Sequence, residues 1–119
     1  MKLAAIIAYA KDNIDKATVG FTLVNAALDS GHKVRVVLAS EGVRLAVKGY
    51  ADDIHSGEPF KPLKQLMEDA LKKGAEINVC TPCMKKRNLA ENEMIPGVRF
   101  IAGAELVAIL DDCDKSLQL

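Results

Sequence analysis

Short apolar runs of strand length alternate with segments of helical periodicity along the whole chain. Runs rich in β-branched side chains favour strands, whereas apolar residues three and four positions apart favour amphipathic helices. Strands are expected at residues 3–8, 33–39, 76–80 and 98–102, with a marginal fifth at 115–119. Helices are expected at about 15–30, 43–48, 63–73, 82–88 and 103–112. This order predicts an α/β fold, in which a mostly parallel sheet of about five strands carries helices on both faces.

The length and composition fit a single domain over residues 1–119. A chain of 119 residues has room for one core, and no linker, repeat or low-complexity tract interrupts it. Only 4% of the residues are aromatic, so that core has to be built from Val, Ile, Leu and Ala. The longest stretch without apolar periodicity, residues 50–59, is expected to be a loop.

Charge and terminal sequence narrow the possible partners. Sixteen basic and sixteen acidic residues give a formal net charge of zero, which provides no positive field for nucleic acid. The apolar N-terminal stretch is too short to span a membrane and lacks the full pattern of a signal peptide. Three cysteines without an export signal indicate a reducing, cytoplasmic location without a disulfide framework. The glycine-rich patterns that cradle phosphates are absent, and we predict no cofactor.

The candidate site lies at one edge of the expected sheet. In open parallel sheets, ligands bind beyond the carboxyl ends of the strands. The segments expected there supply five candidate pocket residues, namely Asn13, Glu41, Gly42, Thr81 and Gly103. Glu41 has an alternative role as a helix cap, and both glycines have one in satisfying backbone geometry.

Only one of these segments, the turn Cys80-Thr81-Pro82-Cys83, contains an evident nucleophile. The pattern places Cys80 at the end of a strand, Thr81 as a helix N-cap, Pro82 in the first helical position and Cys83 in the first turn. The first turn of a helix presents unpaired N–H groups and a positive dipole end, which stabilise a thiolate and lower a cysteine pKa. A thiolate at this edge is a nucleophile, a sulfur carrier or a metal ligand.

The basic run of residues 85–87 directly follows the cysteine turn and either adds positive potential or forms a solvated face.

Other interpretations of the cysteines remain open. Zinc usually takes four ligands, and only His32 and His55 are available besides the cysteines, without ligand spacing. No metal site is therefore predicted within one chain, although a site shared between subunits is an alternative. The two cysteines could also be small core residues, and Cys113 is expected to serve in packing.

The chain resembles the DsrE/DsrF-like (YchN-like) family of small sulfur-relay proteins. The matching segments cover nearly the whole chain in the family's order and comprise residues 15–18, 25–28, 31–34, 41–46, 79–83 and 103–107. The resemblance implies a three-layer α/β/α fold and assembly as trimers or hexamers. It also implies that Cys80 accepts sulfane sulfur as a persulfide. Cys83 is absent from many sulfur-carrying members and present in a subgroup described as predicted peroxiredoxins.

Three functions follow as hypotheses. The first is sulfur relay, in which Cys80 takes sulfur from a donor protein or small persulfide and passes it to a partner, with Cys83 resolving the persulfide. The second is thiol–disulfide redox chemistry by the same pair. The third is a non-enzymatic, oligomeric binding protein with inert or metal-binding cysteines.

Overall fold

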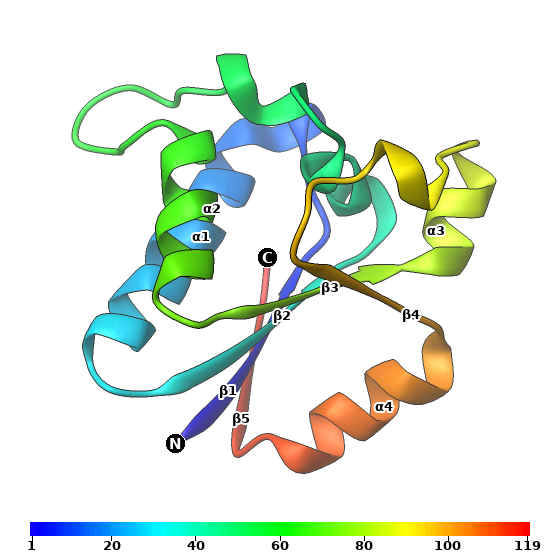
Figure 1. Cartoon of the computed structure of the whole chain (residues 1–119). Coiled ribbons are helices and arrows are strands. Elements are labelled where there is room, and N and C mark those ends of the chain that lie inside the picture. The colour runs from blue at the N-terminus through cyan, green and yellow to red at the C-terminus, as the bar shows by residue number, and fades with distance from the viewer.

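Five parallel strands form one sheet at the centre of the molecule in the computed structural model, which describes all residues from 1 to 119 (Figure 1). Their order across the sheet is β4-β3-β2-β1-β5. The strands are β1 (Lys2–Ile7), β2 (Lys33–Leu38), β3 (Glu76–Cys80), β4 (Val98–Ile101) and β5 (Lys115–Gln118). The prediction of a mostly parallel sheet of about five strands is confirmed, and every neighbouring pair is parallel.

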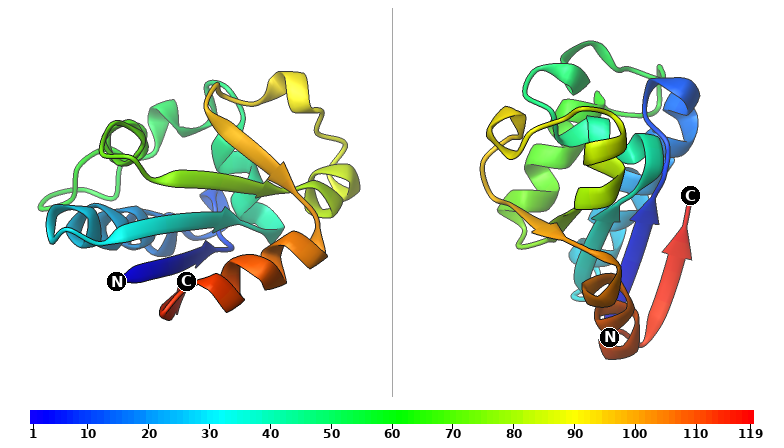
Figure 2. Two further views of the ribbon diagram at one scale, coloured as in Figure 1. Left: turned by 60° about the horizontal axis from the view of Figure 1, so that its bottom comes forward. Right: turned by 90° about the vertical axis from the view of Figure 1, so that its right-hand side faces the viewer.

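Helices cover both faces of this sheet. The helices α1 (Ile14–Asp29) and α2 (Leu63–Lys72) pack side by side on one face, and α4 (Gly103–Asp112) lies on the other (Figure 2). A short helix, α3 (Thr81–Lys86), continues directly from the end of β3. The expected three-layer α/β/α fold is therefore confirmed. None of the helices is both long and apolar enough to cross a membrane.

The main core lies between the sheet and the α1–α2 layer. It contains 23 buried residues, almost all of them aliphatic, with Phe21 as its only aromatic member. The helix α2 buries one stripe made of Leu63, Leu66, Met67 and Ala70, because apolar residues three and four positions apart share a helix face.

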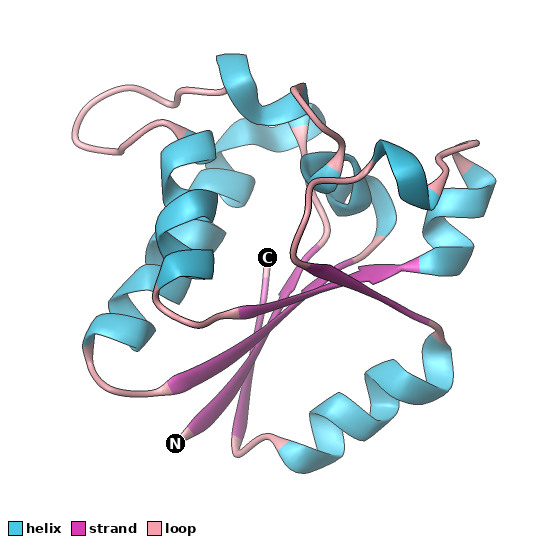
Figure 3. Ribbon diagram, viewed as in Figure 1, coloured by secondary structure: helices cyan, strands magenta, loops and turns pink.

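Three local features differ from the sequence-based expectation (Figure 3). Residues Ser40–Ala46 form a 3₁₀ helix, and the expected loop begins with a 3₁₀ turn at Tyr50–Asp53. The placement of Thr81 as an N-cap is wrong, since α3 begins at Thr81 and Cys80 occupies the cap position. The Thr81 hydroxyl instead donates a hydrogen bond to the carbonyl oxygen of Ile101 at 3.1 Å, which ties α3 to the end of β4.

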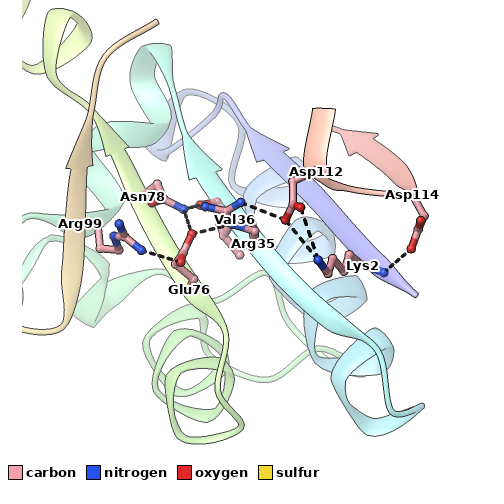
Figure 4. Close-up of polar contacts among 8 residues, drawn as sticks. All are labelled: Lys2, Arg35, Val36, Glu76, Asn78, Arg99, Asp112 and Asp114. Carbon is pink, nitrogen blue, oxygen red and sulfur yellow. Dashed lines mark hydrogen bonds and ion pairs between the residues drawn. The ribbon is translucent and has the colours of Figure 1, made fainter. Parts of the chain in front are cut away.

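The layer under α4 is thin. Its apolar core has only four buried residues, and Val107 on the outer side of α4 is 65% exposed. Next to this small core, Glu76 on β3 receives hydrogen bonds from Arg35 at 2.8 Å, Arg99 at 2.8 Å and Asn78 at 2.9 Å (Figure 4). These contacts join the side chains of three neighbouring strands on one face.

The same polar cluster holds the last turn of α4 to the sheet. Asp112 lies 3.5 Å from Arg35 and 3.4 Å from the amine of Lys2 (Figure 4). Asp114, just beyond α4, accepts a hydrogen bond from the backbone N–H of Lys2 at 2.8 Å. Polar contacts therefore supplement the few apolar ones on this side of the molecule.

Glu76→Gln is expected to lower the free energy of unfolding at neutral pH by about 1–2 kcal/mol, because Arg35 and Arg99 lose a charged acceptor. Burial raises the pKa of Glu76, but hydrogen bonds from Asn78 and Arg35 and the charges of both arginines outweigh burial and hold that pKa below its ordinary value. A lowered pKa means that this stabilisation is present at neutral pH and is lost as the pH falls through the folded-state pKa.

The measurement is urea unfolding of wild type and variant across the acidic range. The difference between the two proteins should be largest at neutral pH and should shrink in acid. The exposed Glu91, which has no side-chain partner, provides a matched control, and Glu91→Gln should change little. An equal effect of both substitutions would show that the cluster contributes nothing specific.

Candidate functional site

The carboxyl ends of the strands meet at one edge of the sheet, and the two cysteines lie there. Cys80 is the last residue of β3, in register with Ile101 of β4. The 3₁₀ helix Ser40–Ala46 follows the end of β2 and packs against α3. This packing brings residues that are more than forty positions apart into one site.

Cys80 and Cys83 lie close together, one at the end of β3 and the other in the first turn of α3. Both residues are free cysteines and both are partly buried. The side chain and the backbone N–H of Cys83 both affect the pKa of the Cys80 thiol. The backbone N–H of Ser40 donates to Cys83 Sγ at 3.2 Å. The pair is thus held by the 3₁₀ helix on one side and by its own turn on the other.

Burial raises the pKa of the Cys80 thiol above its ordinary value. The hydrogen bond to the Cys83 sulfur raises it further, and the backbone N–H of Cys83 and the charge of Arg87 oppose these effects without outweighing them. The expectation that this turn would lower the pKa of Cys80 is therefore wrong. Burial of the Cys80 sulfur raises its pKa by more than the nearby N–H group and the charge of Arg87 lower it.

Arg87, the residue after α3, contacts both the backbone of Cys83 and the carboxylate of Glu41. It forms an ion pair with Glu41, and its guanidinium donates to the carbonyl oxygen of Cys83 at 3.1 Å and to the Ser40 hydroxyl at 3.5 Å. Arg44 binds the second oxygen of Glu41 at 2.8 Å. Hydrogen bonds from Arg87 and then Arg44 hold the pKa of Glu41 below its ordinary value.

The basic run after the cysteines thus has two different parts. Lys85 and Lys86 are exposed, as expected for a solvated face. The side chain of Arg87 is only 13% exposed, so that interpretation is wrong for Arg87.

The remaining sequence-predicted residues lie around this edge. Gly42 packs against the end of β1, where a Cβ atom would lie 3.0 Å from the carbonyl carbon of Ile7 and would overlap its oxygen. Asn13 uses its side-chain oxygen to accept the N–H of Lys16 and so caps α1. Gly103 begins α4 beyond the end of β4 and has open space around it.

The histidines and the third cysteine are not part of this arrangement. His32 lies beside the chain's N-terminal amine at 3.0 Å, and His55 contacts the carbonyl oxygen of Phe60 at 3.0 Å. Cys113 packs against the small core under α4. No group of three or more metal-ligating side chains is gathered in the structure.

A cavity of about 350 Å³ is lined by Leu45, Met67 and Ile95 among other residues. Neither Cys80 nor Cys83 lines this cavity, so the cysteine pair lies apart from it.

Sequence reasoning predicted no contact for Ser40, and for Arg87 it predicted only a general positive potential or a solvated position. Their contacts to Cys83 and Glu41 depend on how the 3₁₀ helix folds over α3, and no local pattern encodes that arrangement. One signal was available: Arg87 stands four positions after Cys83, the spacing that brings two residues together on one side of a helix.

Comparison with known proteins places the chain in a family. An uncharacterized protein of Methanopyrus kandleri is 29% identical over 113 residues, covering 95% of this chain and 89% of that protein. One from Methanocaldococcus jannaschii is 28% identical over 115 residues, covering 97% and 96%. The crystal structure of the ychN protein from E. coli matches all of this chain over its own full length with a TM-score of 0.80 at 20% identity, which shows a shared fold. The model of the DsrE/DsrF-like family matches residues 1–119, and the chain belongs to this family.

Proposed function

We propose that this protein is a sulfur-relay protein that accepts sulfane sulfur as a cysteine persulfide at the Cys80–Cys83 pair and passes it to a partner. The observation that carries the proposal is the pair itself. Two partly buried free thiols lie three positions apart at the carboxyl edge of a parallel sheet, and the backbone N–H of Ser40 donates to one of them. Family membership supports the same class of chemistry.

The transfer is a thiolate exchange and needs no external oxidant. A cysteine thiolate attacks the outer sulfur of a donor persulfide, the donor's sulfur–sulfur bond breaks, and the donor leaves as a thiolate. The protein then holds a persulfide of the same oxidation level. Attack by an acceptor thiolate on the outer sulfur returns the protein's cysteine and moves the sulfur onward. Donor and acceptor are therefore thiol-bearing proteins or small persulfides.

The working context is part of the proposal. A homo-oligomer, trimeric or hexameric, is the form expected of this family. Three free thiols in one small chain favour a reducing compartment such as the cytoplasm, where they stay reduced.

Mass spectrometry of the intact protein after incubation with a small persulfide tests this function. The expected result is a mass increase of about 32 Da, one sulfur atom, that a reductant removes. The variant Cys113→Ser should still take up sulfur, because Cys113 lies under α4 and away from the pair. A double variant with serine at positions 80 and 83 should take up none. Equal uptake by the double variant contradicts the proposal.

Thiol–disulfide chemistry is a second candidate, favoured by two free thiols only three positions apart at the start of α3. It predicts a reversible mass loss of about 2 Da with a disulfide reagent, and no sulfur adduct on the wild type or on either single serine variant. Persulfide formation on a single variant distinguishes sulfur relay from this candidate, since one remaining cysteine cannot form the internal disulfide.

A further inference from the structure

We propose that the small pocket between α4 and strands β2–β4 binds an amino-acid persulfide of the cysteine type, held by its ammonium and carboxylate groups, as the sulfur donor. The inference rests on the proposed function and names the class of its small donor. The pocket has a volume of about 190 Å³. Its walls include Arg35, Asn78, Arg99, Ile101, Glu105 and Ala108.

Asn78 offers this pocket a buried carbonyl oxygen without a partner. The residue is 1% exposed, and its Oδ1 atom accepts no hydrogen bond from the chain. The orientation of the amide is fixed, because Nδ2 donates to the carbonyl oxygen of Val36 at 3.0 Å and to the carboxylate of Glu76 at 2.9 Å (Figure 4). Turning the amide over would set Oδ1 against two acceptors. Since buried polar atoms in native proteins are nearly always hydrogen-bonded, Oδ1 requires an N–H or O–H donor from a ligand.

Charged groups of both signs line the same pocket. Arg99 donates through one guanidinium nitrogen to Glu76 at 2.8 Å, and its side chain is 64% exposed, which leaves its other N–H groups free for an anion. One oxygen of Glu105 accepts the N–H of Ala102 at 3.1 Å, which leaves the second oxygen free for a cation. Two acceptors beside a guanidinium are complementary to a small molecule that carries both an ammonium and a carboxylate group.

The size and position of the pocket connect this ligand to the cysteines. Pockets for drug-sized ligands measure about 300–1,000 Å³, so this smaller pocket suits a molecule of the size of an amino acid. Ile101 in its wall is in register with Cys80 on the neighbouring strand. Asn78 stands two residues before Cys80 on β3, a rise of about 7 Å along the strand. The short side chain of a bound amino acid thus has little distance to cover to the strand end where the cysteine pair lies.

The chemical step is the thiolate exchange of the proposed function. A thiolate of the pair attacks the outer sulfur of the donor R–S–SH, where R–SH is the free amino-acid thiol. The new sulfur–sulfur bond forms on the protein, the donor's bond breaks, and R–S⁻ leaves as a thiolate. Asn78, Arg99 and Glu105 bind the donor and exchange no proton or electron with it.

Three small persulfides that differ in their charged groups test this inference. The persulfides of L-cysteine, cysteamine and 3-mercaptopropionate carry both charged groups, the ammonium alone and the carboxylate alone. At limiting concentration, mass spectrometry of the intact wild type should show uptake from cysteine persulfide at least about tenfold faster than from the other two, the factor expected for one lost hydrogen bond to a charged group. Equal rates from all three overturn the inference and leave sulfur relay intact, whereas no uptake from any of them contradicts sulfur relay itself.

Variants at the pocket remove the influence of each donor's own reactivity. Arg99→Ala should slow uptake from cysteine persulfide about tenfold and leave uptake from cysteamine persulfide, which has no carboxylate, unchanged. Ala108→Leu, at an exposed position of α4, should fill the pocket and slow uptake from cysteine persulfide without loss of the helix. Lys72→Ala is the matched control, because it removes an exposed positive charge on α2, across the sheet from the pocket. Equal slowing of both donors by Arg99→Ala contradicts recognition of the carboxylate and overturns the inference.

Binding of L-cysteine itself gives a readout that needs no sulfur transfer. In the double variant with serine at positions 80 and 83, L-cysteine under reducing conditions should shift the side-chain amide resonances of Asn78 in NMR spectra. The side chain of Asn25 provides the control, since it is also buried but donates to carbonyl oxygens in the α1–α2 layer. Its resonances should stay in place. Unshifted Asn78 resonances, or equal shifts of both residues, overturn the assignment of the pocket.

Discussion

Gly42→Ala is expected to destabilise the protein by about 3–5 kcal/mol, which is among the larger effects of a single substitution. The added Cβ would overlap the carbonyl oxygen of Ile7 and lie 3.0 Å from its carbon. That carbonyl cannot move away easily, because it accepts the N–H of Ala39 at 3.1 Å at the end of the β1–β2 pairing. The clash is with backbone and not with a flexible side chain, so either the strand end or the 3₁₀ helix Ser40–Ala46 has to shift.

Urea unfolding measures this effect, and Gly103→Ala is its matched control. Gly103 has no neighbour within 4 Å at its missing Cβ and begins a helix, where alanine is the better helix former. The control variant should be as stable as wild type or slightly more stable. A loss below about 1 kcal/mol for Gly42→Ala would mean that the two segments separate at little cost, and the clash argument would then be wrong.

A shift of the 3₁₀ helix would also reach the cysteine pair. Ser40 and Glu41 directly precede Gly42 and contact Cys83 and Arg87. Residual folded Gly42→Ala protein should therefore show slower alkylation of Cys83, while labelling of the remote Cys113 should be unchanged. Because Gly42 has no side chain, the 3₁₀ helix can pack closely against the end of β1, and this packing positions Ser40 and Glu41 next to Cys83 and Arg87.

The alternation of elements and the turn of the chain that carries the cysteines were predictable from sequence. Apolar runs such as that of β2 have strand length and β-branched centres, and the periodicity of α2 is clear. These are local signals, in which the residues that form an element also encode it. The rule that ligands bind at the carboxyl ends of parallel strands then indicated the right edge of the sheet.

Strand order was not predictable, although it explains the layers. From β1 through β4 the chain advances in one direction across the sheet, and right-handed crossovers then place α1 and α2 on the same face. After β4 the chain returns to pair β5 with β1, and this reversal places α4 on the opposite face. Nothing local in the sequence marks the reversal, because it depends on which edge of the finished sheet is free.

The electrostatics of the site also depended on the fold. Position at a strand end and helix start suggested an easily ionised Cys80, but the amount of solvent that the fold removes from Cys80 reverses that direction. The contact from Ser40 to Cys83 joins residues 43 positions apart, and the Glu41–Arg87 pair joins residues 46 apart. Such contacts arise from the packing of one element on another and follow no sequence spacing.

Arg87→Ala is expected to lower the free energy of unfolding by about 2–3 kcal/mol at neutral pH and to slow alkylation of Cys83 several-fold. The substitution removes a charge-assisted pair with Glu41 and the hydrogen bond to the Cys83 carbonyl oxygen. It also removes the contact to the Ser40 hydroxyl, so the N–H donor to Cys83 is held less firmly. Arg44→Ala is the matched control, because Arg44 binds the same carboxylate but is 34% exposed and has no contact to Ser40 or Cys83. Its cost should be about 0–1 kcal/mol, with alkylation unchanged.

The pH dependence of stability gives a second, independent readout of the same pair. The hydrogen bond from Arg87 is the main reason that the pKa of Glu41 lies below its ordinary value, with Arg44 second. The stabilisation linked to this shift is therefore present at neutral pH and is lost as the pH falls through the folded-state pKa. Arg87→Ala should remove most of that acid-dependent loss, and Arg44→Ala should remove less. If both variants show the same stability, alkylation rate and acid profile, Arg87 merely neutralises Glu41. A selective effect of Arg87→Ala on Cys83 would instead show that this arginine positions the backbone donor on which the reactivity of the sulfur depends.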